Sequence, residues 1–156
     1  MRSRSWAIVC TPVLLAGALA AQGAPATPRR QVEPLLESMM VAANAHDTDR
    51  FLAPYLHDST LVMVFNGAVI SGFDSVRTLQ LKWWNNGRSD VVYTRRAPAR
   101  FRVLGPDALI VTDALRSQRT DSAGVTRQAD FAATSVWQKR PEGWRIVAVH
   151  ESTAGR

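Results

Sequence analysis

The sequence predicts an α+β domain in which N-terminal helices pack on one face of a strongly curved antiparallel sheet. Apolar residues recur with the helical period of 3.6 through the first half of the chain, up to Trp84. Beyond Val91 they alternate with the strand period of 2, in four runs separated by short turns. Helices grouped ahead of such strands are typical of α+β folds rather than of alternating α/β folds.

Three helices are expected before the long strands. The first spans residues 31–44, because its apolar side chains share one helical face: Val32, Leu35, Leu36, Met39, Met40 and Ala43. A second helix is expected over residues 48–56. A third takes Asp74 or Ser75 as its N-cap and ends at Trp84. Residues 61–65 and 68–70 form a hairpin between the second and third helices, since Asn66-Gly67 is a strong hairpin-turn signal.

The long strands are expected over residues 91–104, 108–119, 126–140 and 144–153. Their short connections imply an antiparallel meander. Pro98 lacks a backbone donor, so the first run is expected to bend or bulge there. A curved sheet closed by helices leaves a concave cavity, which is the natural place for a small ligand.

The N-terminus has the pattern of a secretory signal peptide over residues 1–20. Arg2 and Arg4 precede a short apolar segment, and Ala18-Leu19-Ala20 is typical of a cleavage site. We therefore expect export to the periplasm or the medium, a flexible leader over residues 21–30, and one domain over residues 31–153. Cys10 is the only cysteine and would be removed with the signal, so the exported domain folds without disulfides.

Charge and motifs narrow the function classes. The net charge is +6, but the arginines are scattered and form no basic stripe, so nucleic-acid binding is not expected. No membrane contact is expected after signal cleavage. The histidines lack metal-ligand spacing, and phosphate-binding and dinucleotide-binding motifs are missing from the sequence. We expect neither a metal nor a cofactor.

The last strand contains the first candidate site residue, His150. Strict alternation places it on the same face as Trp144, Ile146 and Ala148, which favours the interior. An imidazole there titrates near neutral pH and is suited to act as a base or a hydrogen-bond donor. A satisfied core histidine is the alternative.

Other candidates for the cavity wall are Asp113, Tyr93, Trp83, Trp137, Met39 and Tyr55. Asp113 shares one alternation with apolar residues, and a carboxylate on such a face is costly unless it is paired or protonated. Which face Asp113 occupies stays open at this point. Trp83 and Trp84 point in different directions, so one is expected at the cavity and the other in the core. Arg102 and Arg116 are expected at the surface, with binding of a ligand carboxylate as the alternative.

The chain resembles the nuclear transport factor 2-like superfamily, in its SnoaL-like and ketosteroid-isomerase-like branch of small bacterial domains. The matching segments are residues 44–47, 51–58, 72–76, 102–108, 136–147 and 150–152. The resemblance implies a cone-shaped α+β barrel, commonly a homodimer, with a pocket between helices and sheet. Its isomerase members carry a tyrosine on the first helix, whereas residues 31–44 contain none.

Three functions remain open from the sequence. The leading expectation is an exported domain that binds a small, largely apolar molecule. The second is a cofactor-independent isomerase, cyclase or dehydratase with His150 as general base, supported by Asp113 or Tyr93. The third is a non-catalytic accessory module, which predicts a filled cavity and an exposed apolar patch.

Overall fold

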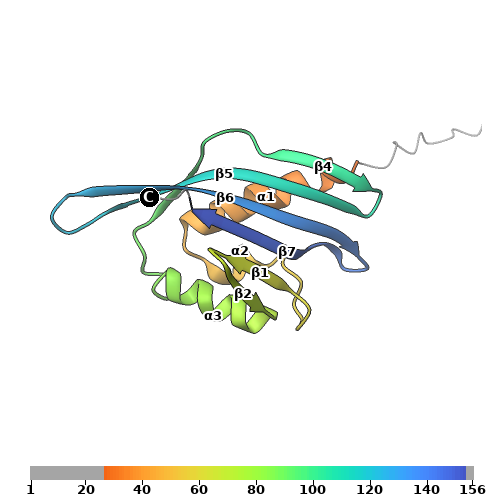
Figure 1. Ribbon diagram of the computed structural model, residues 1–156, viewed down its shortest axis with the longest axis horizontal. Helices are drawn as coiled ribbons and strands as arrows, with labels where there is room; N and C mark the ends of the chain where they lie inside the picture. Colours follow the sequence, from red (N-terminus) through yellow and green to blue (C-terminus); the bar gives the residue numbers. More distant parts are fainter. Residues whose placement is uncertain (1–26, 154–156) are drawn as a thin grey trace, which may run out of the picture.

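The computed structural model describes residues 27–153, which form three helices and a curved sheet of seven strands, with β1 and β2 between the second and third helices (Figure 1). The helices are α1 (Pro28–Asn44), α2 (Thr48–Leu52) and α3 (Phe73–Trp83). The strands are β1 (Val62–Phe65), β2 (Ala68–Ser71), β3 (Val92–Arg95), β4 (Arg100–Gly105), β5 (Ala108–Thr120), β6 (Thr126–Arg140) and β7 (Gly143–Thr153). None of the described helices is long and apolar enough to cross a membrane. The predicted signal peptide lies outside the described residues.

Helix α1 begins three residues before its predicted start. Thr27 is its N-cap and accepts a hydrogen bond from the Arg30 backbone, while Pro28 occupies the first turn, where a missing N–H costs nothing. Residues 28–30 are therefore helical rather than part of a leader. Periodicity missed this turn because it carries no apolar side chain that would mark the buried face.

Helix α2 is shorter than predicted and ends at Leu52. Pro54 follows two residues later and cannot continue a helix, which the apolar pattern alone did not reveal. The chain turns toward the sheet instead, and Tyr55 forms an isolated parallel bridge with Ile146 of β7. Helix α3 starts from Gly72, which has a φ of 83° and no side-chain cap, so neither Asp74 nor Ser75 is its N-cap.

The strand order is β2-β1-β7-β6-β5-β3, with β4 also pairing with β5. The predicted meander is present from β4 to β7, and every one of its pairings is antiparallel. The pairing of β1 with β7 is parallel, so the sheet is mixed. Pro98 lies between β3 and β4, and these two strands pair with successive lengths of β5 as the predicted bend requires.

The helices cover one face of the curved sheet. In Figure 1, α1 crosses behind β5 and β6, while α3 lies beyond β1 and β2 at the lower edge. The main core lies between these layers and contains side chains from both, including Leu36 of α1, Val111 of β5 and Trp137 of β6. The far ends of β5 and β6 extend past the other strands as a long hairpin.

A β-bulge at Val147 changes which residues of β7 face the helices. Trp137 of β6 pairs with Ile146 and Val136 pairs with Ala148, so Val147 has no partner in the ladder. Before the bulge, the buried residues are Trp144 and Ile146; after it, Val149 is buried and His150 is exposed. One inserted residue shifts a period-2 pattern by one position, so the inner face passes from even to odd numbers.

Candidate functional site

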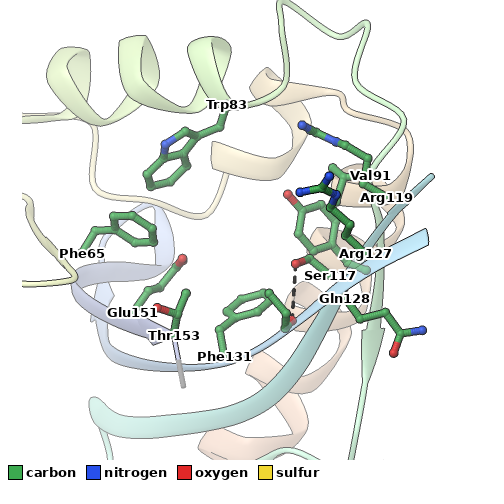
Figure 2. A pocket seen from close by; sticks show the side chains of 12 residues that line it. Phe65, Trp83, Val91, Ser117, Arg119, Arg127, Gln128, Phe131, Glu151 and Thr153 are labelled. Carbon is green, nitrogen blue, oxygen red and sulfur yellow. Dashed lines mark hydrogen bonds between the residues drawn. The ribbon is translucent and has the colours of Figure 1, made fainter. Parts of the chain in front are cut away.

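A cavity of about 340 Å³ opens between the end of the sheet and helix α3 (Figure 2). Its walls come from β1, α3, β3, the β5–β6 hairpin and β7, and we call it the outer cavity. The lining side chains are those of Phe65, Trp83, Val91, Tyr93, Ser117, Arg119, Arg127, Gln128, Ala129, Phe131, Glu151 and Thr153. Most of the wall is aromatic or aliphatic, while the polar hairpin residues lie at its mouth.

Two smaller spaces adjoin the outer cavity. An inner chamber of about 70 Å³ lies between α1 and the middle of the sheet, with Met39, Tyr55 and Asp113 among its lining residues. A side chamber of about 80 Å³ lies between Trp84, Phe51 and Tyr93. Glu151 lines the outer cavity and both chambers. Glu151 is therefore a wall residue common to all three spaces.

Glu151 has no partner for its carboxyl group. Within residues 27–153, no hydrogen bond or ion pair to this side chain is found. Burial raises the pKa of Glu151 from its usual value to about 7, because the apolar surroundings penalise the charged form. A carboxyl group with this pKa exchanges protons near neutral pH, as a general acid or base must.

Asp113 is the second carboxylate of the inner face, and it is more deeply buried than Glu151. Its Oδ2 accepts a hydrogen bond of 2.7 Å from Arg95 Nε, and Arg95 also binds Glu37 of α1. The Asp113 side chain is 7% exposed, and its Oδ1 has no hydrogen-bond partner in the described structure. Burial raises the pKa of Asp113, while the Arg95 guanidinium opposes that rise. The open question of its orientation is answered, since Asp113 faces inward.

The aromatic candidates divide between cavity and core. Trp83 lines the outer cavity and is only partly buried, whereas Trp84 is 1% exposed. Tyr93 lines the outer cavity and its hydroxyl accepts a hydrogen bond of 3.0 Å from Trp84 Nε1. Burial raises the pKa of Tyr93, so its phenol is neutral at physiological pH. Trp83 and Tyr93 thus both form part of the cavity wall.

Met39 and Tyr55 both line the inner chamber. Tyr55 is 2% exposed. Its pKa is raised mainly by burial and further by the nearby charge of Glu151. Met39 belongs to the main core and contributes an apolar wall. These two residues bring an unbranched side chain and a phenol to the space that also contains Asp113.

The inward orientation predicted for His150 is wrong. The bulge at Val147 turns His150 to the outer face of the sheet, where it pairs with Thr134 of β6 and Val64 of β1 and is exposed. Trp137 is also absent from the cavity walls: it is fully buried, and its Nε1 donates to Ser135 Oγ at 2.9 Å. Neither residue lines the outer cavity or the two chambers.

Glu151 is the site residue that sequence reasoning missed. The available signal was a carboxylate in the last predicted strand, directly after the candidate His150. Strict alternation, which put His150 on the inner face, leaves Glu151 on the outer one, and only the bulge reverses that assignment. Arg116 and Arg102 do not line the outer cavity; Arg116 pairs with Asp130 at 2.7 Å and Arg102 is exposed.

The described residues contain no cluster of three or more histidine, cysteine, aspartate or glutamate side chains placed to hold a metal ion. Two arginines lie at the mouth of the outer cavity instead. Arg119 and Arg127 are directly opposite each other on β5 and β6, and Arg119 pairs with Asp90 at 2.9 Å. The site thus combines an apolar interior, one unpaired carboxyl group and a basic mouth.

Comparison with solved structures finds the same fold in several bacterial proteins. An NTF-2 like protein of unknown function from Shewanella oneidensis is 21% identical, with a TM-score of 0.65 over 81% of this chain and 99% of that one. A ketosteroid isomerase-like protein from Erwinia carotovora atroseptica is 20% identical, with a TM-score of 0.64 over 81% and 96%. An NTF2-like protein of unknown function from Pseudomonas putida is 17% identical, with a TM-score of 0.69 over 82% and 87%.

These structures confirm the resemblance to the nuclear transport factor 2-like superfamily and show the fold alone. No curated protein matches the chain. Residues 28–155 match the model of the calcium/calmodulin dependent protein kinase II association domain, which covers almost all of the folded region. The chain therefore belongs to the calcium/calmodulin dependent protein kinase II association domain family, with an NTF2-like α+β fold.

Proposed function

We propose that the protein binds a small, largely apolar molecule in the outer cavity. The observation that carries the proposal is an open space of about 340 Å³ with aromatic walls, which has the size and lining of a ligand site. An accessory module without a ligand would be expected to fill this space with side chains. Glu151 and the hydroxyl of Tyr93 are the polar groups available to orient a molecule within it.

Calorimetric titration with 2-naphthol, a rigid apolar molecule that fits such a space, tests the binding proposal. We expect saturable binding to the mature protein. Ala129 lines the mouth, so Ala129→Trp should weaken 2-naphthol binding by about tenfold or more by occupying the entrance. The matched control is Ala123→Trp, in the exposed β5–β6 turn, which should bind 2-naphthol like the wild type. Equal binding by both variants would place the ligand elsewhere.

A second candidate function is proton transfer without a cofactor, with Glu151 in the role first predicted for His150. It is favoured by an unpaired carboxyl group whose pKa burial raises to about 7 and which faces an apolar cavity. In this reaction the carboxylate removes a proton from a carbon next to a carbonyl group. It then returns the proton to the same or to a conjugated carbon.

Hydrogen–deuterium exchange of 2-tetralone in D₂O measures that step directly. The exchange rate should rise with pH through about 7, as Glu151 ionises, and fall by about 100-fold or more in Glu151→Gln. His150→Gln is the control and should leave the rate unchanged, because that side chain is on the opposite face of the sheet. Exchange that persists in Glu151→Gln would exclude Glu151 as the base.

Export and self-association remain predictions from the sequence and its family resemblance. N-terminal sequencing of the mature protein tests cleavage near Ala20 and separates export from cytoplasmic retention. Light scattering at a fixed protein concentration tests the predicted homodimer, and a monomer mass at all concentrations would contradict it.

A further inference from the structure

Four aromatic rings from four different elements line the outer cavity together with Glu151. Phe65 of β1 and Trp83 of α3 form one pair, with ring centroids 4.6 Å apart. Tyr93 of β3 and Phe131 of β6 form a second, edge-to-face pair at 6.2 Å. Figure 2 shows the Glu151 side chain reaching from β7 into the space between Phe65 and Phe131, with Trp83 across the cavity. Aromatic faces carry negative electrostatic potential, so the rings attract a cation, as the carboxylate does.

Glu151 lacks a cation although the protein has many. The chain contains 19 lysines and arginines against 13 acidic residues, and Asp113, Asp130 and Asp49 each pair with an arginine. No cation from residues 27–153 pairs with Glu151. A half-buried carboxylate in apolar surroundings without a counter-charge is costly to ionise, and a bound cation would remove that cost.

We propose that the ligand is a small organic cation, an alkylated ammonium whose charged head lies against the Glu151 carboxylate among the four rings. The inference rests on the proposed binding function and names its ligand class. The apolar body of the molecule fills the remainder of the outer cavity.

The arginines at the mouth do not oppose this assignment strongly. Arg119 and Arg127 are exposed, and Arg119 already has Asp90 as its partner, so water and salt weaken their effect on a charge at Glu151. An interaction with Glu151 takes place in an apolar environment, where electrostatic energies are larger. An anion held between the two arginines is the competing ligand class, and the experiment below includes it.

Cation binding should be coupled to proton release from Glu151. The titratable or charged groups that face it across the three spaces are Tyr55, Tyr93 and Asp113, with Arg119 and Arg127 at the mouth. Both phenols stay neutral because burial raises their pKa values, and the side chains contributed by β1 and α3, Phe65 and Trp83, carry no charge. A cation therefore favours the ionised form of Glu151, and its affinity should rise with pH through about 7.

Three probes of nearly equal shape separate charge from size: choline, 3,3-dimethylbutan-1-ol and 3,3-dimethylbutanoate. Each is titrated into the mature protein by calorimetry near pH 8 and near pH 5.5. We expect choline to bind at least about tenfold more tightly than the alcohol near pH 8, and this ratio to fall to about two near pH 5.5. In Glu151→Gln, choline should bind no better than the alcohol, while the alcohol keeps its wild-type affinity. Glu142→Gln, at the exposed β6–β7 turn, should retain the wild-type preference.

Four results would overturn the inference. If the alcohol binds as tightly as choline near pH 8, the ligand is not a cation, and the proposed binding function stands. If the butanoate binds most tightly and loses affinity in Arg127→Gln, the site takes an anion instead. If neither choline nor the alcohol binds but 2-naphthol does, the ligand class is wrong; if 2-naphthol also fails, the proposed binding function fails with it.

Discussion

Asp113 and Glu151 are two inward-facing carboxylates that line the same inner chamber, but among the described residues only Asp113 has a cationic partner. Asp113 is bound by Arg95, which in turn reaches Glu37 and so ties β5 and β3 to helix α1. No cation within residues 27–153 pairs with Glu151, and burial raises its pKa to about 7. Asp113 therefore links elements of the fold, whereas the carboxyl group of Glu151 remains free to interact with a ligand. It makes Glu151 the residue to test for function.

The largest expected effect comes from removing the paired carboxylate. Asp113→Ala leaves Arg95 partly buried beside an empty space, so the free energy of unfolding should fall by about 3 kcal/mol. Urea denaturation at neutral pH measures this loss. Asp49→Ala breaks the exposed pair with Arg77 and should cost less than about 1 kcal/mol. Equal losses in both variants would remove the structural role assigned to Asp113.

The unpaired carboxylate should behave in the opposite way. The pKa of Glu151 is higher in the folded chain than in the unfolded chain, so the folded state holds the extra proton between about pH 4.5 and pH 7. Stability therefore falls as pH rises through that window and is lowest above it. Glu151→Gln should raise the free energy of unfolding near pH 8 by on the order of 1–3 kcal/mol, and change it little near pH 4.5. A loss of stability near pH 8 would show that Glu151 has a structural partner.

A new cation should convert Glu151 into a residue like Asp113. Thr153 lies two positions further along β7 and also lines the outer cavity, so Thr153→Arg places a guanidinium within reach of Glu151. The pKa of Glu151 should fall by about one unit or more. The midpoint of the pH-dependent stability change should fall with it, as measured by thermal unfolding from pH 4 to pH 9. Thr153→Gln has a similar length without the charge and should leave the midpoint in place.

The smallest effect is expected at the neighbouring His150. Its side chain is exposed on the outer face, so His150→Leu should change the free energy of unfolding by less than about 0.5 kcal/mol. A thermal midpoint within about 2 °C of wild type, at one fixed protein concentration, would agree with this position. A fall of about 3–6 °C, which corresponds to a loss of ~1 kcal/mol, would mean that His150 makes a stabilising contact.

The order of elements followed from local patterns in the sequence. The apolar stripe that begins at Val32 predicted α1, and Asn66-Gly67 predicted the β1–β2 hairpin, where both residues have positive φ angles. Pro98 predicted the break between β3 and β4. These signals act over a few residues, so a single sequence contains them. Pro54 acts over the same short range, so the early end of α2 at Leu52 could also have been predicted from the sequence.

The sequence predicted where the cavity lies, but not which polar side chain faces into it. Alternation along β7 depends on every residue occupying one position in the ladder, and the bulge at Val147 breaks that condition. The bulge is a feature of the register between β6 and β7, and Ile146 beside it also bridges to Tyr55 from a distant part of the chain. The sequence alone therefore determined an α+β domain with a ligand-sized hollow between helices and sheet. Only the tertiary structure decided that Glu151, rather than His150, faces into it, because a one-residue shift in strand register exchanges the two faces.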